Sequence, residues 1–150
     1  MSDTDQKFSA SFADKATFKP GLRDFLEYRD LGVLEATNGE FKAHVLRVKK
    51  DFEGDQDMKT TGYHQHMVTF QMFYVLNGWV TFDYEGVGVK TYRKGDCVLA
   101  PAKIKHNELK CSEDFEALEI LSPGIHDTVQ EDGKVPVSYT HLTLPTNREV

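Results

Sequence analysis

The sequence of 150 residues lacks any apolar run close to the roughly 20 residues that a membrane-spanning helix needs. Its first 16 residues also lack the positive charge and the apolar segment of a secretory signal. Hydrophobic residues still make up 39% of the chain, enough to bury a core. We therefore expect one globular domain in the cytoplasm, with no membrane partner.

Cysteines and clustered basic residues are also scarce. The two cysteines, in a chain without an export signal, are predicted to be reduced thiols, Cys97 as a buried residue within a strand and Cys111 as a turn residue. Lys and Arg total 18 against 24 Asp and Glu, so the net charge is −6. Nucleic acid is excluded as a partner, because phosphate binding needs a Lys/Arg surface.

The two ends of the chain differ from its middle. Residues 1–16 are polar and aperiodic, which predicts a flexible arm that orders only by packing its phenylalanines on the body. Residues 137–150, beginning VSYTHL, resemble a translated transposon-end adaptor of the kind found at the ends of metagenomic reading frames. We expect this tail to be non-native and exclude its His141 from the site. A single domain is expected over residues 17–136.

The first part of that domain predicts a short helix and a hairpin. Residues 22–29, LRDFLEYR, carry apolar side chains at helical spacing. Residues 31–37 and 41–49 alternate with a period of two around the turn signal Asn38-Gly39. His44 falls on the opposite face from its apolar neighbours, which indicates a surface or inter-sheet position outside the site.

After an acidic loop at residues 51–60, the chain becomes a series of short strand-like segments with no helical pattern between them. They lie at residues 63–77, 79–86, 87–96, 96–101, 106–110 and 115–121. Such a series is typical of an antiparallel sandwich or barrel, so an all-β fold is expected.

A pair of histidines opens this series. His64 and His66 are one residue apart, so on a strand both imidazoles leave the same face. They form either a chelating pair or a chance pair on a solvated face. Four residues separate His66 from Gln71, and six more precede Gly78.

A second motif follows downstream, with five residues between Gly95 and Pro101 and four between Pro101 and His106. The two motifs together resemble those of the cupins, over about residues 62–106. The resemblance implies a small single-domain cupin of the RmlC-like superfamily, whose fold is a jelly-roll or double-stranded β-helix barrel. The chain departs from the motifs at four points: Gln71 replaces the usual Glu, Lys103 replaces a Gly, and Lys110 replaces the closing Asn. The opening glycine of the first motif is also absent at its usual distance, with Gly62 lying nearer.

The resemblance also implies one divalent metal ion held by His64, His66, Gln71 and His106. Three imidazoles and one oxygen donor suit Fe, Mn, Ni, Zn or Cu, with positions left open for catalysis. Neutral Gln71 would leave the full charge of the metal to attract an anionic ligand. Alternatively, Gln71 hydrogen-bonds a bound water or substrate and leaves a three-histidine site.

Other side chains are predicted to line this site. Phe73 shares a face with Gln71, while Tyr74 and Trp79 either bind substrate or pack in the core. Glu119 and Glu108 are candidates for general acid or base catalysis. The alternative for both is a solvated carboxylate on an edge strand.

Three functions remain open from the sequence. A metal-dependent lyase or isomerase is favoured, because the Gln71 arrangement resembles that of small cupins which linearise unsaturated uronates. An iron-dependent dioxygenase and a non-enzymatic sugar- or metabolite-binding cupin are the alternatives. Cupins commonly pair, so we expect a homodimer acting on a small-molecule ligand.

Overall fold

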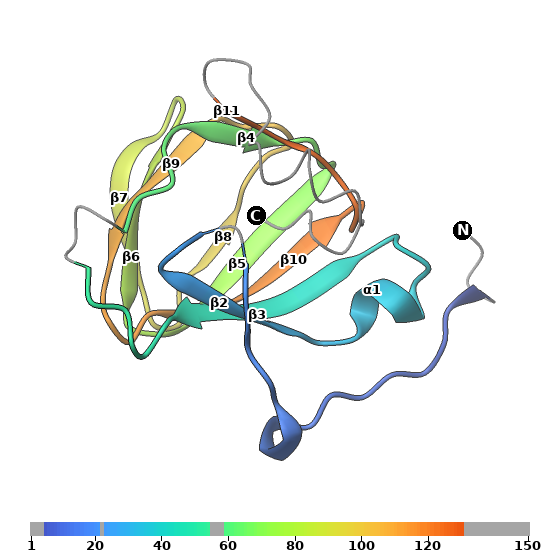
Figure 1. Ribbon diagram of the computed structural model, residues 1–150. Helices are drawn as coiled ribbons and strands as arrows, with labels where there is room; N and C mark the ends of the chain where they lie inside the picture. The colour runs from blue at the N-terminus through green and yellow to red at the C-terminus, as the bar shows by residue number, and fades with distance from the viewer. Residues whose placement is uncertain (1–4, 22, 55–58, 131–150) are drawn as a thin grey trace.

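The computed structural model describes residues 5–21, 23–54 and 59–130, and its strands form two antiparallel sheets. One sheet has the order β1-β2-β3-β10-β5-β8 and the other β11-β4-β9-β6-β7. In Figure 1, β4, β6, β7 and β9 curve around one side of the molecule, opposite β2, β3, β5 and β10. The predicted all-β jelly-roll is confirmed, but as two separate sheets and not as a closed barrel.

The first sheet contains β1 (Lys19–Pro20), β2 (Leu26–Asp30), β3 (Lys42–Val48), β5 (Phe70–Asn77), β8 (Cys97–Leu99) and β10 (Glu116–Ser122). The second contains β4 (His64–His66), β6 (Trp79–Tyr84), β7 (Gly88–Arg93), β9 (His106–Cys111) and β11 (Thr128–Gln130). Helix is limited to a 3-10 turn, η2 (Ala13–Lys15), and a single turn, α1 (Val33–Ala36). No helix in the described ranges is long and apolar enough to cross a membrane.

The segment predicted as a short helix is instead strand β2, so that prediction is wrong. Leu26 and Tyr28 point inward and are buried, and Tyr28 pairs with Leu46 of β3. Phe25, in the turn before the strand, is also buried, which produces the apparent helical spacing. Pairing with β3 therefore overrides the local pattern.

The predicted hairpin is displaced along the chain. Its second strand is β3, but the first predicted strand, residues 31–37, contains α1 instead. The partner of β3 on this side is β2, and α1 lies in the connection between them. The predicted turn is confirmed, since Asn38 and Gly39 both have left-handed backbone angles, with φ of 51° and 87°.

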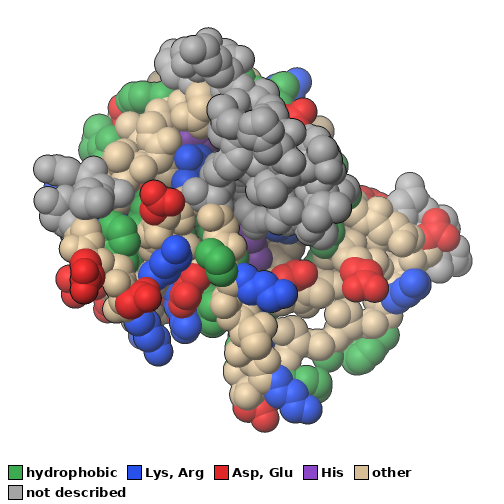
Figure 2. All heavy atoms as spheres, viewed as in Figure 1, with side chains coloured by type: hydrophobic (Ala, Val, Ile, Leu, Met, Phe, Trp, Pro, Cys, Tyr) green, Lys and Arg blue, Asp and Glu red, His purple; other side chains and the backbone are tan. Residues whose placement is uncertain are grey.

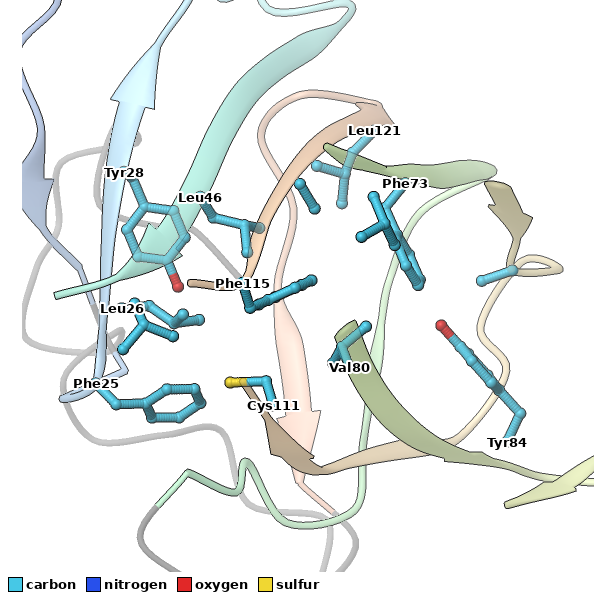
Figure 3. Packing of buried hydrophobic residues seen from close by; sticks show 14 of the residues in the cluster. Phe25, Leu26, Tyr28, Leu46, Phe73, Val80, Tyr84, Cys111, Phe115 and Leu121 are labelled. Carbon is cyan, nitrogen blue, oxygen red and sulfur yellow. The ribbon is translucent and has the colours of Figure 1, made fainter. Parts of the chain in front are cut away.

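The hydrophobic core lies between the two sheets. Figure 3 shows Phe115 near the centre of this cluster, with side chains of β2 and β3 on one side and side chains of β5 and β6 on the other. The labelled residues on these two sides are Tyr28, Leu26 and Leu46, and Phe73, Val80 and Tyr84. The metal-ligand candidates border this apolar core, which shields them from water.

Both cysteines are free thiols, as predicted, but their positions are the reverse of those expected. Cys97 is exposed at the start of β8, and Cys111 is fully buried at the end of β9. A register shift in the pairing of β9 with β6, opposite Thr81 and Phe82, leaves Leu109 unpaired and turns Cys111 inward. The predicted strand ended at residue 110, so Cys111 was wrongly expected in a turn when it is the last residue of β9.

The N-terminal arm follows the outside of the molecule next to α1 (Figure 1). It is held by polar contacts, including Lys7 N–H to Ala36 O at 2.9 Å and Arg29 Nη2 to Ser11 Oγ at 3.0 Å. Phe8 is 95% exposed and Phe12 63%, so the expected packing of arm phenylalanines on the body is wrong. The predicted non-native tail, residues 137–150, lies outside the described residues.

Charged side chains of both signs are interspersed on the face of the molecule shown in Figure 2. Histidine side chains show there only as small areas between other atoms, as expected for buried imidazoles.

Lys103 adopts a backbone conformation that favours glycine, with φ of 63°, at the position where the cupin motif has Gly. A non-glycine residue in the left-handed region destabilises the folded state by about 1–2 kcal/mol. Glycine avoids this strain, but it also raises the conformational entropy of the unfolded chain, which offsets part of the gain in stability. We expect Lys103→Gly to raise the free energy of unfolding by about 0.5–1 kcal/mol, measured by urea denaturation. Lys90→Gly, in the extended strand β7, is the matched control and should destabilise. A Lys103→Gly protein no more stable than wild type would contradict this account.

Candidate metal centre

Three of the four predicted metal ligands converge between strands β4 and β9. His64 and His66 both lie on the buried face of β4, with Gln65 on the other face. His64 pairs directly with His106 of β9. The ring centroids lie 4.3 to 5.2 Å apart, and each ring offers one nitrogen within 4.8 Å of the others. All three side chains are buried. Strand pairing thus unites two motifs that lie far apart in the sequence.

The Nδ1 atom of each ring is already engaged. Nδ1 lies 2.7 Å from Gly62 O in His64 and 3.0 Å from Ile104 O in His106. A carbonyl oxygen only accepts, so both Nδ1 atoms carry the proton and each Nε2 keeps a free lone pair. Nδ1 of His66 lies 2.8 Å from Thr128 Oγ1. These contacts orient the rings and leave Nε2 as the ligand atom.

The three imidazoles are held in their neutral form. Burial is the main cause that lowers the pKa of each ring, and the nearby charge of Arg23 lowers it further. For His64 the pKa falls to about 2. Neutral imidazole is the form that binds a metal, so no proton must be displaced.

The cluster fits a transition-metal ion. Two nitrogens bonded to zinc with tetrahedral geometry are about 3.4 Å apart, so closing from 4.8 Å needs each nitrogen to move by about 0.8 Å or less. Nitrogen donors of this kind suit zinc, iron, nickel or copper better than magnesium or calcium. His64, His66 and His106 are the residues that would hold the ion.

Gln71, the predicted fourth ligand, is buried in the lining of the same cavity. Its Nε2 donates to Glu119 Oε2 at 3.0 Å. Because the amide nitrogen is used in this way, the amide oxygen is the atom of Gln71 left to face a metal or a bound ligand.

Glu119 links Gln71 to a further histidine. Its other oxygen, Oε1, lies 2.7 Å from Nε2 of His44, which is the residue directly opposite it on β3. Burial alone would raise the pKa of Glu119, but the hydrogen bonds and charge of His44, with the hydrogen bond from Gln71, lower it overall. Glu119 is therefore an ionised carboxylate with both oxygens engaged, and it is not a solvated edge residue.

His44 lies outside the cavity lining, as predicted, but it is buried and contacts the site through Glu119. The side chain is buried, stacks on Tyr28 at 5.2 Å between ring centroids, and holds Glu119. It reaches Glu119 because β3 pairs with β10, and β10 also pairs with β5, which carries Gln71. Nothing in the local sequence around His44 indicates this neighbour.

Glu108 is the second predicted acid or base, and it also lies in the cavity lining. It is two residues beyond His106 on the same face of β9 and is buried. Its Oε2 has no hydrogen-bond partner within the described part of the chain. Burial raises the pKa of Glu108 to about 8, although the charge of Arg23 opposes the shift. This carboxyl group can therefore hold a proton near neutral pH.

The predicted substrate-binding aromatic residues separate into two groups. Phe73 lines the cavity and is buried, which confirms that the face of Gln71 points inward. Tyr74 points the other way and is 41% exposed, and Trp79 is half-buried outside the cavity lining. The structure thus brings Phe73 to the site but not Tyr74 or Trp79.

Three residues near the centre received no role from the sequence. Tyr84 stacks on His106, and Arg23 lines the cavity from a segment far from either motif. The ring of His126 packs against His66, with centroids 5.8 Å apart, but it does not line the cavity. No spacing rule connects these residues to the motifs, because β-strand pairing and loop packing bring them there.

Comparison with known proteins supports the assignment of the fold. The family model described as "Cupin domain" matches residues 55–121. The solved structure of KdgF from Halomonas sp. is 19% identical, with a TM-score of 0.60 over 77% of this chain and 94% of that chain. An RmlC-like cupin from Shewanella frigidimarina is 21% identical, with a TM-score of 0.59, and the match covers 85% of this chain and 97% of that chain.

A third similar structure is the polyketide cyclase RemF from Streptomyces resistomycificus, 13% identical, with a TM-score of 0.61 over 95% of this chain and 99% of that chain. A search of curated proteins found no match. At these identities the similarity concerns the fold, and the chemistry must be argued from the residues of this site.

Proposed function

Because this chain is a small cupin-domain protein, we propose that it is a metal-dependent lyase or isomerase acting on a small anionic metabolite. One observation carries the proposal. Three buried, neutral imidazoles are oriented through Nδ1 and line a cavity together with the buried carboxyl group of Glu108, whose Oε2 atom has no hydrogen-bond partner among the described residues. An ion-binding cluster beside a carboxyl oxygen without a partner suits proton transfer more than a purely structural role.

Within this proposal the ligands are His64, His66, His106 and the amide oxygen of Gln71. When bound, a divalent metal would polarise a carbonyl or enol oxygen of the substrate. The protein contributes the orientation of its ligands, with Glu119 holding the amide of Gln71, and Phe73 adds an apolar wall that excludes water.

The two predicted catalytic carboxylates take different roles. Both oxygens of Glu119 are engaged, which supports a positioning role on Gln71. Glu108 lines the same cavity and its Oε2 has no partner among the described residues, which supports it as the group that donates or accepts the substrate proton. An acid or base must reach the substrate, and Glu108 is the better placed of the two.

The charge balance supports an anionic substrate. A divalent ion would keep its two positive charges among neutral ligands, ionised Glu119 would offset one of them, and Arg23 would add one. The carboxylate beside Gln71 therefore reduces the charge expected from the ligands alone, yet the cavity stays positive overall. Opposite charges interact strongly in such a buried site.

The test is metal-dependent proton exchange. Metal content is measured after purification without chelator, and the protein is then incubated in D₂O with 2-hydroxy acids, 2-keto acids and an unsaturated uronate. We expect deuterium incorporation beside the carbonyl or carboxylate, or loss of the uronate's ultraviolet absorbance, and neither in His106→Ala. Oxygen uptake above that control would instead indicate a dioxygenase. Metabolite binding that survives removal of all metal would indicate a binding protein.

We also propose that the protein forms a homodimer through its N-terminal arm. Phe8 and Phe12 are exposed on a segment that is otherwise held by polar contacts, so a second copy could bury them. Sedimentation velocity should show a dimer that Phe8→Ser weakens, and a protein that is monomeric at high concentration would contradict the proposal.

A further inference from the structure

Arg23 brings an unsatisfied positive group to the metal cavity. Its Nη2 atom is buried and has no hydrogen-bond partner among the residues described. The side chain lines the cavity together with the three histidines. A guanidinium keeps its charge at all accessible pH values, so it cannot escape the cost of burial by losing a proton.

The guanidinium is held in place beside Glu108. Its Nη1 donates to Thr61 O at 3.4 Å. Thr61 is tied to Glu108 in turn, through Thr61 N–H to Glu108 O at 3.2 Å and Glu108 N–H to Thr61 Oγ1 at 3.0 Å. Arg23 is therefore held beside Glu108, and its buried Nη2 has no hydrogen-bond partner among the described residues.

None of the described residues satisfies this donor. Glu108 lines the same cavity, and its Oε2 also has no partner among the described residues, so Nη2 and Oε2 do not bond to each other. Buried polar atoms in proteins are nearly always satisfied, and two unsatisfied ones in a single cavity indicate that a ligand completes them.

From this geometry we infer that Arg23 binds the carboxylate of the substrate through Nη2, beside the metal ligands. The inference rests on the proposed function and names the anionic group. Arg23 lies outside the residues matched by the family model, 55–121, so it is a property of this chain's own N-terminal segment. Its role is to select and position the substrate, while proton transfer is left to Glu108.

Carboxylate is favoured over phosphate for two reasons. Arg23 is the only lysine or arginine in the described lining of the cavity, whereas the extra oxygens of a phosphate need further donors. The cavity volume is about 50 Å³, room for a few water-sized groups, which suits the planar end of a small acid.

The first test uses cobalt as a spectroscopic probe of the site. Cobalt-loaded wild type is titrated with glycolate, with ethylene glycol and acetamide as neutral controls and inorganic phosphate as the competing anion. We expect glycolate to change the visible spectrum, and Arg23→Gln to weaken its binding about 10- to 100-fold without loss of cobalt. Arg23→Lys should give an intermediate loss, and Arg29→Gln, whose arginine contacts Ser11 outside the cavity, should bind as wild type.

Three results would overturn the inference. Arg23→Gln could bind glycolate within about threefold of wild type, or cobalt-loaded wild type could fail to bind glycolate. The third result is that phosphate binds through Arg23 more tightly than glycolate does. Circular dichroism establishes whether each variant is folded. If Arg23→Gln does not fold, Arg23→Lys serves as the test variant.

A second measurement separates this inference from the proposed function. The protein is labelled with ¹⁵N-arginine, and the Arg23 guanidinium resonance is assigned by its loss in Arg23→Lys. Glycolate should shift this resonance in the zinc-loaded or metal-free protein. A wild type that takes up no metal would refute the proposed function while leaving this readout intact, and a resonance unmoved by saturating glycolate would refute the role of Arg23.

Discussion

His106→Ala is expected to abolish stoichiometric metal binding. It removes one of three imidazoles whose ligand atoms lie within 4.8 Å, and the remaining pair on β4 cannot enclose an ion. Loss of groups that merely orient ligands costs 10- to 100-fold in affinity, so loss of a ligand should cost about 100-fold or more. Metal analysis and titration calorimetry measure this directly.

Thermal unfolding provides a second readout of the same variant. Metal at about 1,000 times its dissociation constant stabilises a protein by about 4 kcal/mol, which is about 10–20 °C in Tm for a domain of this size. Wild type should show this increase and His106→Ala should not. His126→Gln is the matched control, because His126 is buried beside His66 but does not line the cavity. Equal metal loss in both variants would refute the three-histidine assignment.

Glu108→Gln is expected to change the pH dependence of stability in the metal-free protein. The folded state keeps the proton of Glu108 up to about pH 8, while the unfolded state releases it near the ordinary value of 4.5. Between these values the unfolded state binds fewer protons, so the free energy of unfolding falls as pH rises, by about 4–5 kcal/mol in total. The glutamine variant should lack this loss and be the more stable protein at pH 7.

Urea denaturation of both proteins from pH 4.5 to pH 8 measures this difference. Glu85→Gln, which alters an exposed carboxylate, is the control and should follow wild type. Parallel curves for wild type and Glu108→Gln would show that Glu108 is not destabilised by burial.

The same substitution should have the opposite effect on activity. If Glu108 transfers the substrate proton, glutamine cannot replace it, and kcat of the metal-loaded protein should fall about 10²- to 10⁴-fold with metal binding retained. An active Glu108→Gln enzyme would remove Glu108 from the mechanism. A residue that lowers stability while supporting activity is typical of a functional site.

Strand-forming segments were predicted well where period-two alternation coincided with glycine turns. The segments assigned to β6 through β10 all appear, because each alternates and ends at a turn signal. The stretch predicted as one strand from Tyr63 divides into β4 and β5, which belong to different sheets. Alternation cannot reveal such a crossing, since both parts keep the pattern of an extended chain.

For the candidate site, the sequence predicted some residues correctly and others wrongly. Spacing on a strand predicted that His64 and His66 share a face, and the resemblance to the cupins predicted that His106 joins them, as the pairing of β4 with β9 confirms. The inward face of Gln71 and Phe73 followed from the same parity. Tyr74 and Trp79 do not reach the cavity, since aromatic character alone gives no direction.

The sequence by itself predicted the all-β class from local spacing along strands, and its resemblance to the cupins predicted the cluster of His64, His66 and His106. Only the tertiary structure decided how the ligands are supported: His44 holds Glu119, Glu119 holds Gln71, and Arg23 enters the cavity beside Glu108. These contacts join strands and segments distant in sequence. Their partners are chosen by strand order and burial, which no local pattern encodes.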